Sequence, residues 1–511
     1  MALFNENSRK KNALRTSGAG MIYQVVKILS AFAYRTLFLM VLTKEHLGIN
    51  GLFSNVLQIF SLAELGIGSA IIYRMYLPFG QKDREAIGAL LRFYQKVYRA
   101  IALIVAIVAV LMFPFIRFLV NVEEIPPDVN FVLVYVLFVA QSVSSYFFVY
   151  KQSLLSADQR GHTLALYSGA AELLGYAVKI GVLWVTRSYV LVLACGIAVS
   201  VLCNFLFSKY IDWHYREILD TESNLEPAKQ KGILMDTMGL MCHKIGYVVV
   251  NGTDNLVLSK CVGLAAVGLY YNYYLITASL ATAITGISSG LVPIVGNLVV
   301  TEEKEDSYKV YLHFLGAGMW VAGMTTVCLF VLLNPFIETW KDASYLFGLG
   351  TVAVLCAQYF IQISRLVTNV FINACGLFMR DKARPIFESV INLVVSIVLV
   401  LKIGVAGVFV GTVVSGLATY YWREPYLLLK DYFHKSGREF CRILGTWVVL
   451  TVAAAVLFTW ICGLLPMGWA GFFLRAIVCF AGTNMVFLIL MCRTESFHFF
   501  LRKIAGRLKR G

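Results

Sequence analysis

Apolar residues occur along this chain in long runs that short polar segments separate. A run of about 18 or more apolar residues can cross a bilayer as a helix, because one crossing takes about 20 residues. The runs do not alternate at every second position, as the strands of a membrane barrel would. The pattern therefore predicts an all-α polytopic membrane protein with fourteen transmembrane helices. We expect them at 16–42, 47–73, 89–119, 130–156, 162–186, 189–211, 233–259, 264–299, 308–333, 344–376, 384–401, 405–428, 441–463 and 469–491.

A charged segment at 212–232 separates two groups of six helices and leaves two helices over. LGINGLFSNVLQI at 47–59 and LAAVGLYYNYYLI at 264–276 align without gaps with five identities, and each opens the second helix of its group. Because six is even, both groups start on the same side of the membrane, so the repeat is parallel. We expect an N-lobe at 1–211, a cytoplasmic linker at 212–232, a C-lobe at 233–430, and helices thirteen and fourteen with a basic tail at 431–511.

The composition and charge agree with a membrane protein and set its orientation. The 511 residues are 59% hydrophobic, with a mean hydropathy of +0.74, which excludes a soluble globular protein. If the N-terminus is cytoplasmic, 32 of the 44 lysines and arginines lie in the cytoplasmic segments or at the cytoplasmic ends of the adjoining helices, and six lie in or beside the outer loops. This bias predicts that both termini are cytoplasmic. The net charge of +15 then reflects topology and attraction to anionic lipid, and no nucleic-acid partner is expected.

The sequence carries no pattern typical of an enzyme. The eleven cysteines are scattered and form no C-x-x-C pair, so neither a disulfide framework nor a zinc site is indicated. No P-loop, G-x-S-x-G or H-E-x-x-H motif occurs, and the seven histidines do not cluster. We expect no enzymatic activity, no metal and no cofactor.

Polar residues within the apolar runs recur at helical spacing, so they lie on single helix faces. They occur in helices of both groups, which predicts a polar cavity shared between the lobes. A charge at the bilayer centre costs about 2.5–3.5 kcal/mol and usually faces a bundle interior or a water-filled path. The candidate residues are Gln24, Lys27 and Arg35; Gln58 and Glu64; Glu172 and Lys179; Lys244, Asn251 and Asp254; and Gln358, Gln362, Arg365, Asn369 and Asn373.

The charges in these stripes are five cations and three carboxylates, a surplus of two positive charges. Such a cavity favours an anionic ligand, and guanidinium groups bind phosphate oxygens in pairs. Two other interpretations stay open, because Glu172 and Lys179 could neutralise one another and the long stems of Lys27 and Lys179 could reach the membrane interface. We expect Asp254 to pair with a cation, most plausibly Arg35.

Glu64 stands in the stretch SLAELGIGSAIIYRMY and has two interpretations. Its stripe faces the interior of the N-lobe, and the GIG that follows allows close helix packing, so its carboxylate can pair with Lys27 or Arg35. Alternatively, it is a proton or sodium site whose charge is coupled to lobe motion.

Several segments resemble a known family. NSRKKNALRTSGAGMIYQ at the start, FAYRTLFLMVLTKEHLGINGL after it, ELGIGSAIIYRMYLP with the QKDREAI loop, and TDNLVLSK in helix seven resemble polysaccharide flippases of the multidrug/oligosaccharidyl-lipid/polysaccharide (MOP) exporter superfamily, over about residues 9–430. The resemblance implies a transporter that moves an undecaprenyl-pyrophosphate-linked oligosaccharide from the cytoplasmic to the outer leaflet by alternating access. By the same resemblance, Arg35 and Asp254 match the family's helix-one arginine and helix-seven aspartate, and helices thirteen and fourteen form a groove for the lipid tail.

The implied setting is the bacterial cytoplasmic membrane and surface polysaccharide biosynthesis. The expected partners are the lipid-linked oligosaccharide and membrane lipids, with a polysaccharide polymerase and glycosyltransferases as candidates, and the protein is expected to be a monomer. Rival functions are a cation-coupled multidrug exporter of the same superfamily, a membrane glycosyltransferase or polymerase, and a non-transporting scaffold of polysaccharide assembly.

Overall fold

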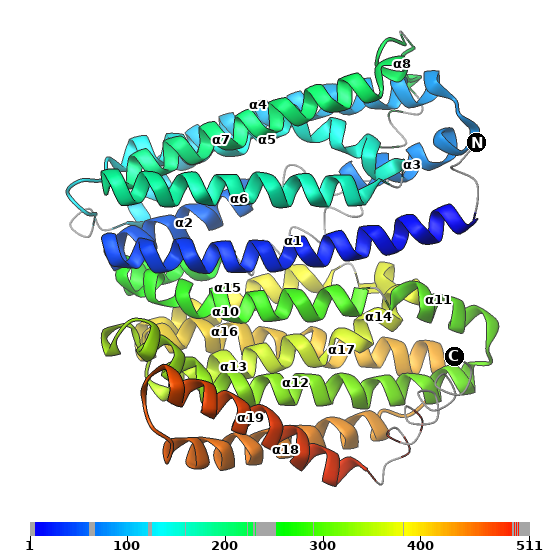
Figure 1. Ribbon diagram of the computed structural model, residues 1–511. Coiled ribbons are helices and arrows are strands. Elements are labelled where there is room, and N and C mark those ends of the chain that lie inside the picture. The colour runs from blue at the N-terminus through cyan, green and yellow to red at the C-terminus, as the bar shows by residue number, and fades with distance from the viewer. Residues whose placement is uncertain are drawn as a thin grey trace. The chain divides into compact units, whose positions relative to one another are not determined.

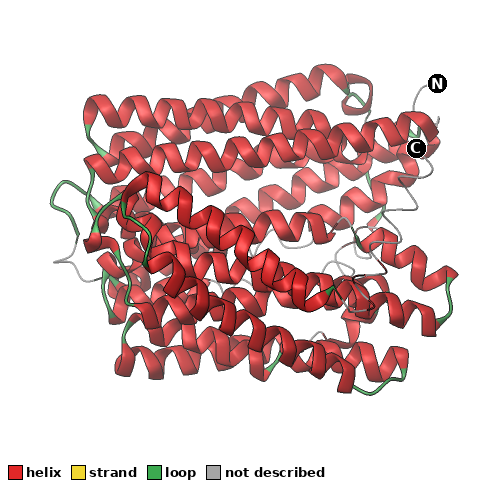
Figure 2. Ribbon diagram, turned by 60° about the horizontal axis from the view of Figure 1, so that its bottom comes forward, coloured by secondary structure: helices red, strands yellow, loops and turns green. Residues whose placement is uncertain are grey.

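The computed structural model describes residues 6–60, 67–120, 125–158, 160–221, 223–227, 252–289, 291–381 and 383–492, together with residues 230, 233, 495, 497 and 499. Within these ranges the chain forms helices and loops and no strand (Figure 2), so the all-α prediction is confirmed. Eleven helices of the described residues are long and apolar enough to cross a membrane. The total of fourteen and the cytoplasmic location of both termini stay predictions.

The chain divides into two compact units, residues 1–268 and residues 269–511. The lobe and linker boundaries predicted from the sequence differ from this division and stay a prediction. Unit 1 contains a helical segment at 252–261 and the first residues of α10. Its other helices are α1 (Glu6–Val41), α2 (Lys44–Phe60), α3 (Ile67–Gln81), α4 (Arg84–Leu119), α5 (Phe131–Ala157), α6 (Gly161–Thr186), α7 (Tyr189–His214) and the short α8 (Arg216–Leu219).

Side-chain caps explain where several helices of unit 1 begin. The Asp83 carboxylate accepts the Ala86 backbone N–H at 2.9 Å ahead of α4, and the Asn130 amide oxygen accepts the Leu133 N–H at 3.1 Å ahead of α5. Such a cap satisfies one of the N–H groups that the first helical turn leaves without a partner. The charged and polar residues between the apolar runs therefore set the ends of the spans.

Unit 1 is held together by helices that pack along their lengths. α1 packs against α6, α6 against α7, and α5 against both α4 and α7 (Figure 1). The Phe53 ring of α2 lies 5.1 Å from that of Phe131 and 5.3 Å from that of Phe138, both on α5. The Tyr135 hydroxyl donates to the Ala109 carbonyl oxygen at 2.6 Å, which satisfies a buried polar group between α5 and α4.

The two segments of the internal repeat touch within unit 1. A Cβ added to Gly48 would lie 2.1 Å from the Leu264 carbonyl oxygen, and one added to Gly268 would lie 2.3 Å from the Lys44 carbonyl oxygen. Only a residue without a side chain permits so close an approach of two backbones. The repeat detected in the sequence therefore includes the residues at which the starts of α2 and α10 pack together.

Unit 2 holds the remainder of the chain. Two of its predicted spans are broken helices: the tenth is α13 and α14, divided at Arg365, and the twelfth is α16 and α17, which run on into a π-helical turn, η6. Its helices are α10 (Leu264–Ser289), α11 (Val292–Thr301), α12 (Lys304–Trp340), α13 (Leu349–Ser364), α14 (Leu366–Ala374), α15 (Arg384–Ile403), α16 (Val405–Ala418), α17 (Tyr420–Tyr426), η6 (Leu427–Phe433), α18 (Arg438–Gly463) and α19 (Gly468–Met491), with 3-10 turns η4 (Ala343–Tyr345) and η5 (Leu377–Asp381).

The long helix α12 is central to the packing of unit 2. α13, α18 and α19 all pack against it, and α15 forms a close hairpin with α16 (Figure 1). The Trp320 indole N–H of α12 donates to the Asn484 amide oxygen of α19 at 3.0 Å. The Cys328 and Cys479 sulfurs of the same two helices lie 3.9 Å apart. Helices thirteen and fourteen of the prediction, α18 and α19, are therefore integral to unit 2.

Candidate functional site

The predicted lysine of helix five lies in an aromatic setting between α6 and α1. The Lys179 ammonium is 5.5 Å from the centre of the Tyr176 ring and 5.9 Å from that of Tyr34, and these two rings are 5.8 Å apart. Its stem crosses α7 at Gly196, where an added Cβ would lie 2.4 Å from Lys179 Cε. Cation–π contacts of this kind are worth about 0.5–2 kcal/mol, so the ammonium is held in place without a direct carboxylate partner.

Glu172 lies on α6 two turns before Lys179 and is half-buried. No ion pair within 4.0 Å joins these two described side chains, and Glu172 Oε2 is buried without a hydrogen-bond partner. The structure therefore contains no direct ion pair between Glu172 and Lys179, and the interpretation that they neutralise one another stays a prediction. A buried carboxylate oxygen without a partner is costly and favours the binding of a cation or water.

The other predicted residues of unit 1 fall into three groups. Arg35 and Asp254 are both buried, and their pairing stays a prediction. Lys27 is exposed, with its ammonium 5.8 Å from the centre of the Tyr23 ring, and Gln24 is half-buried. Glu64, Lys244, Asn251 and the side chain of Gln58 lie outside the described residues.

The predicted stripe of helix ten follows α13 and α14 in unit 2. Gln358 and Asn369 are half-buried, whereas Gln362 and Asn373 are exposed. The Asn373 amide donates to the Asn369 amide oxygen at 2.9 Å. These amides flank Arg365, at which the helix is interrupted.

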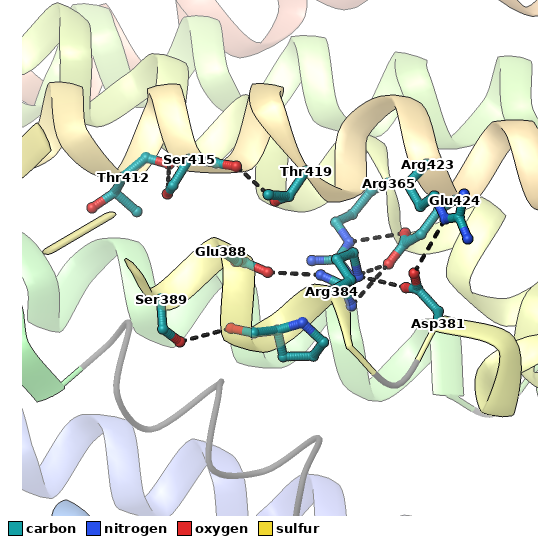
Figure 3. A network of polar contacts seen from close by, with 11 residues as sticks. Arg365, Asp381, Arg384, Glu388, Ser389, Thr412, Ser415, Thr419, Arg423 and Glu424 are labelled. Carbon is teal, nitrogen blue, oxygen red and sulfur yellow. Dashed lines mark hydrogen bonds and ion pairs between the residues drawn. The ribbon is translucent and has the colours of Figure 1, made fainter. Parts of the chain in front are cut away.

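Arg365 is engaged by a carboxylate that the sequence analysis did not include. Its Nε donates to Glu424 Oε2 at 3.2 Å and its Nη2 donates to Glu424 Oε1, so the pair is bidentate (Figure 3). The ring of Tyr420, which like Glu424 is a residue of α17, lies 3.9 Å from the guanidinium carbon of Arg365. The surplus of two positive charges counted from the stripes omitted Glu424 and falls to one when it is included.

A second arginine, Arg384, extends this pair into a network (Figure 3). It donates to Asp381 and, at 2.7 Å, to Glu388, and its Nη2 lies 3.5 Å from Glu424 Oε1. Arg423 Nε lies 3.8 Å from Asp381. Three arginines thus alternate with three carboxylates where η5, α15 and α17 meet. The charged segment RDKARPIFE at 380–388 is the part of the sequence that indicates this network. Nothing in the segment shows that Arg365 and Glu424 contact it in the fold.

No protein-family model matches the chain, and no curated protein sequence matches it. Solved structures do match. The inward closed form of the lipid II flippase MurJ superposes with a TM-score of 0.65 at 14% identity, over 94% of this chain and 99% of that one. An inward-facing multidrug-resistance MATE transporter of the MOP superfamily gives a TM-score of 0.60 at 17% identity, over 80% of this chain and 95% of that one. The Vibrio cholerae MATE transporter VcmN gives 0.52 at 13% identity, over 82% and 97%. The chain has the MOP fold.

Unit 1 also contains an ion pair that joins two long helices. In unit 1, Lys151 near the end of α5 pairs with Asp212 of α7 at 2.5 Å. This pair joins the fourth and sixth predicted spans, and the Arg365–Glu424 pair joins the tenth and twelfth. The paired residues are 61 and 59 positions apart along the chain. After α5, Asp158 pairs with Arg160 at 2.9 Å and accepts a hydrogen bond from the Tyr215 hydroxyl. Charged contacts therefore join long helices within each unit.

The described residues contain no group of three or more histidine, cysteine, aspartate or glutamate side chains that could hold a metal ion. The chemistry available in unit 1 is that of buried cations beside aromatic rings, and in unit 2 that of a compensated charge network. Both suit binding and conformational change.

Proposed function

We propose that the protein is a transporter that flips an undecaprenyl-pyrophosphate-linked oligosaccharide repeat unit from the cytoplasmic to the outer leaflet of the bacterial cytoplasmic membrane, for surface polysaccharide biosynthesis. The shared fold with both a lipid flippase and multidrug transporters supports transport by alternating access of two lobes. A bilayer-crossing protein of this fold has no need of a catalytic residue, so no enzymatic activity is proposed.

The share of the chain that each comparison covers favours a lipid-linked substrate. The MATE transporter covers 80% of this chain and MurJ covers 94%. Beyond the two groups of six helices, residues 438–511 make up about one seventh of the chain. Those residues include α18 and α19, which pack against α12 and offer a surface of exposed apolar side chains such as Val449, Trp460 and Ile477. The apolar surface of α18 and α19 is the observation that carries the proposal, because a polyprenyl tail needs one and a drug does not.

Buried cations in unit 1 support an anionic head group. Arg35 is buried within a stripe of polar residues, and Lys179 is held beside two tyrosine rings that could also stack on a sugar. Cations in a low-dielectric site attract a pyrophosphate much more strongly than the same cations would in bulk water. Glu172, Glu64 and Asp254 are the candidates for coupling transport to a proton or sodium ion.

The test is to identify the lipid that purifies with the protein. We expect extraction and mass spectrometry of gently purified wild type to yield a polyprenyl-pyrophosphate oligosaccharide, which Arg35→Ala depletes and Arg35→Lys partly retains. Arg99→Ala is the matched control, since Arg99 is an exposed arginine of α4 and its loss should leave the bound lipid unchanged. Bulk phospholipid alone in the wild type would contradict the proposal.

A cellular measurement separates the rival functions. A strain without the protein should lose surface polysaccharide if the protein is a flippase, and should gain drug sensitivity if it is a cation-coupled multidrug exporter. If the protein is a glycosyltransferase, a polymerase or a scaffold, its loss would also reduce surface polysaccharide. In that case, however, the lipid-linked repeat unit would still be accessible on the outer face of the membrane. Accumulation of that lipid on the inner face is the result that the flippase proposal requires.

A further inference from the structure

A groove of about 400 Å³ opens in unit 2 beside the charge network, between the first turns of α15 and the helix α17. Arg380, Arg384 and Arg423 line it together with Asp381. Phe387 and Ile391 of α15 and Trp422 of α17 form its apolar wall. The groove therefore combines three guanidinium groups with a surface that favours hydrocarbon.

The three arginines are not equally engaged. Arg384 donates to Asp381 and Glu388 and lies 3.5 Å from Glu424, so its guanidinium is engaged by three carboxylates (Figure 3). Among the described residues, Arg380 and Arg423 each have one carboxylate partner, Asp431 at 3.6 Å and Asp381 at 3.8 Å, and both distances are too long for a hydrogen bond. Both of the latter guanidinium groups therefore keep N–H donors available.

The charges are also segregated by depth. The side chains of Glu424 and Asp381 are 2% and 6% exposed, whereas those of Arg380 and Arg423 are 63% and 38% exposed. Glu388 is largely buried beside Arg384, and Asp431, the partner of Arg380, is 32% exposed. The network is balanced as a whole, but what it presents at the groove is mainly positive.

The apolar wall continues along α15. Phe387, Val390 and Val394 recur at helical spacing on this helix and are each more than half exposed. A helix of 20 residues that is apolar enough to span the membrane and exposes such a face is solvated by acyl chains. The Trp422 indole N–H donates to the Ala418 carbonyl oxygen at 2.7 Å, so its exposed ring is free to lie among lipid at the interface.

We propose that this groove binds an anionic phospholipid. Arg380 and Arg423 hold the phosphate, Arg384 supplies positive potential behind them, and the acyl chains run along Phe387 and Val390. Arginine is suited to this task because its planar fork binds two phosphate oxygens at once. The ligand is a lipid of the surrounding membrane that stays on the surface of unit 2, and the proposal does not depend on which substrate the protein transports.

Native mass spectrometry of the detergent-purified full chain tests the proposal. With equal amounts of phosphatidylglycerol and phosphatidylcholine of distinct masses, we expect wild type to retain phosphatidylglycerol preferentially and Arg380→Gln/Arg423→Gln to lose that preference several-fold. Arg438→Gln/Arg442→Gln is the matched control, because it removes the same charge from two exposed arginines at the start of α18. Excess inorganic phosphate should not displace the lipid.

Three outcomes would overturn the proposal: an unchanged preference in the groove variant, an equal loss in the control, or displacement by inorganic phosphate. A second measurement does not depend on how the arginine variant folds. Phosphatidylglycerol with brominated acyl chains should quench tryptophan fluorescence in wild type more than in Trp422→Phe, and brominated phosphatidylcholine should not show this difference. Equal quenching of the two proteins by both lipids would also overturn it.

Discussion

At the scale of single residues, the Arg365–Glu424 and Lys151–Asp212 ion pairs differ in burial, and this difference should decide their contribution to stability. Glu424 and Arg365 are 2% and 23% exposed, whereas Asp212 and Lys151 are 32% and 14% exposed. Removing one partner of a buried pair leaves a charge without compensation and costs about 3–5 kcal/mol. A partly exposed pair keeps access to water and is worth about 1 kcal/mol or less.

We therefore expect Glu424→Gln to lower the thermal unfolding temperature by several degrees and Asp212→Asn to lower it much less. The measurement is unfolding of the purified proteins in the same detergent, followed by the loss of the monodisperse peak in size-exclusion chromatography. Equal shifts in the two variants would contradict the difference in burial that the structure assigns to the two pairs.

At the scale of helices, the hairpin of α15 and α16 depends on close backbone contact. A Cβ added to Gly407 would lie 2.3 Å from the Leu399 carbonyl carbon and 2.5 Å from the Val400 nitrogen. Gly411 and Ser415 follow at intervals of four, which places three small residues on one face of α16. Small residues at this spacing are how helices in a membrane approach closely enough to gain packing energy.

Gly407→Ala should destabilise the protein, because the methyl group can be accommodated only by moving backbone, at a cost of about 1–3 kcal/mol. Gly445→Ala is the matched control: Gly445 also lies within a spanning helix, α18, and has no atom near its added Cβ. There the helix propensity of alanine should give a gain of about 0.5–1 kcal/mol. Thermal unfolding in detergent measures the sign of the stability change in each variant. A loss of stability of similar size in both variants would mean that α15 and α16 are not packed in this way.

The helices could be predicted from the sequence but the charge network could not, and the reason is physical. Hydrophobic runs determine spans directly, and eleven of the fourteen predicted helices meet the criteria of a membrane span within the described residues. Helical periodicity shows which face a residue occupies, so it placed Arg365 in a polar stripe. It does not show which helix that face meets, and Glu424 lies 59 positions away near the end of the twelfth apolar run. Helical periodicity also placed Lys179 in a polar stripe, but it did not show that the ammonium lies beside the rings of Tyr34 on α1 and Tyr176 on α6.

At the scale of the whole molecule, the distribution of basic residues makes a prediction about topology. Thirty-two of the 44 lysines and arginines fall in cytoplasmic segments or at the cytoplasmic ends of the adjoining helices if fourteen helices cross the membrane and the N-terminus lies inside. Three exposed cysteines of the described residues, Cys261, Cys441 and Cys492, can report on this arrangement without any added label site. Five predicted helices separate Cys261 from Cys441, and two separate Cys441 from Cys492.

An odd number of crossings puts two sites on opposite sides of the membrane, and an even number puts them on the same side. A membrane-impermeant maleimide applied to intact spheroplasts should therefore label Cys261, while Cys441 and Cys492 should react only after the membrane is permeabilised. Peptide mapping by mass spectrometry identifies which cysteine carries the label, and the permeabilised sample is the control for reactivity. Labelling of Cys261 and Cys441 from the same side would contradict the five predicted crossings between them, and with them the parallel arrangement of two six-helix groups on which the proposed alternating access depends.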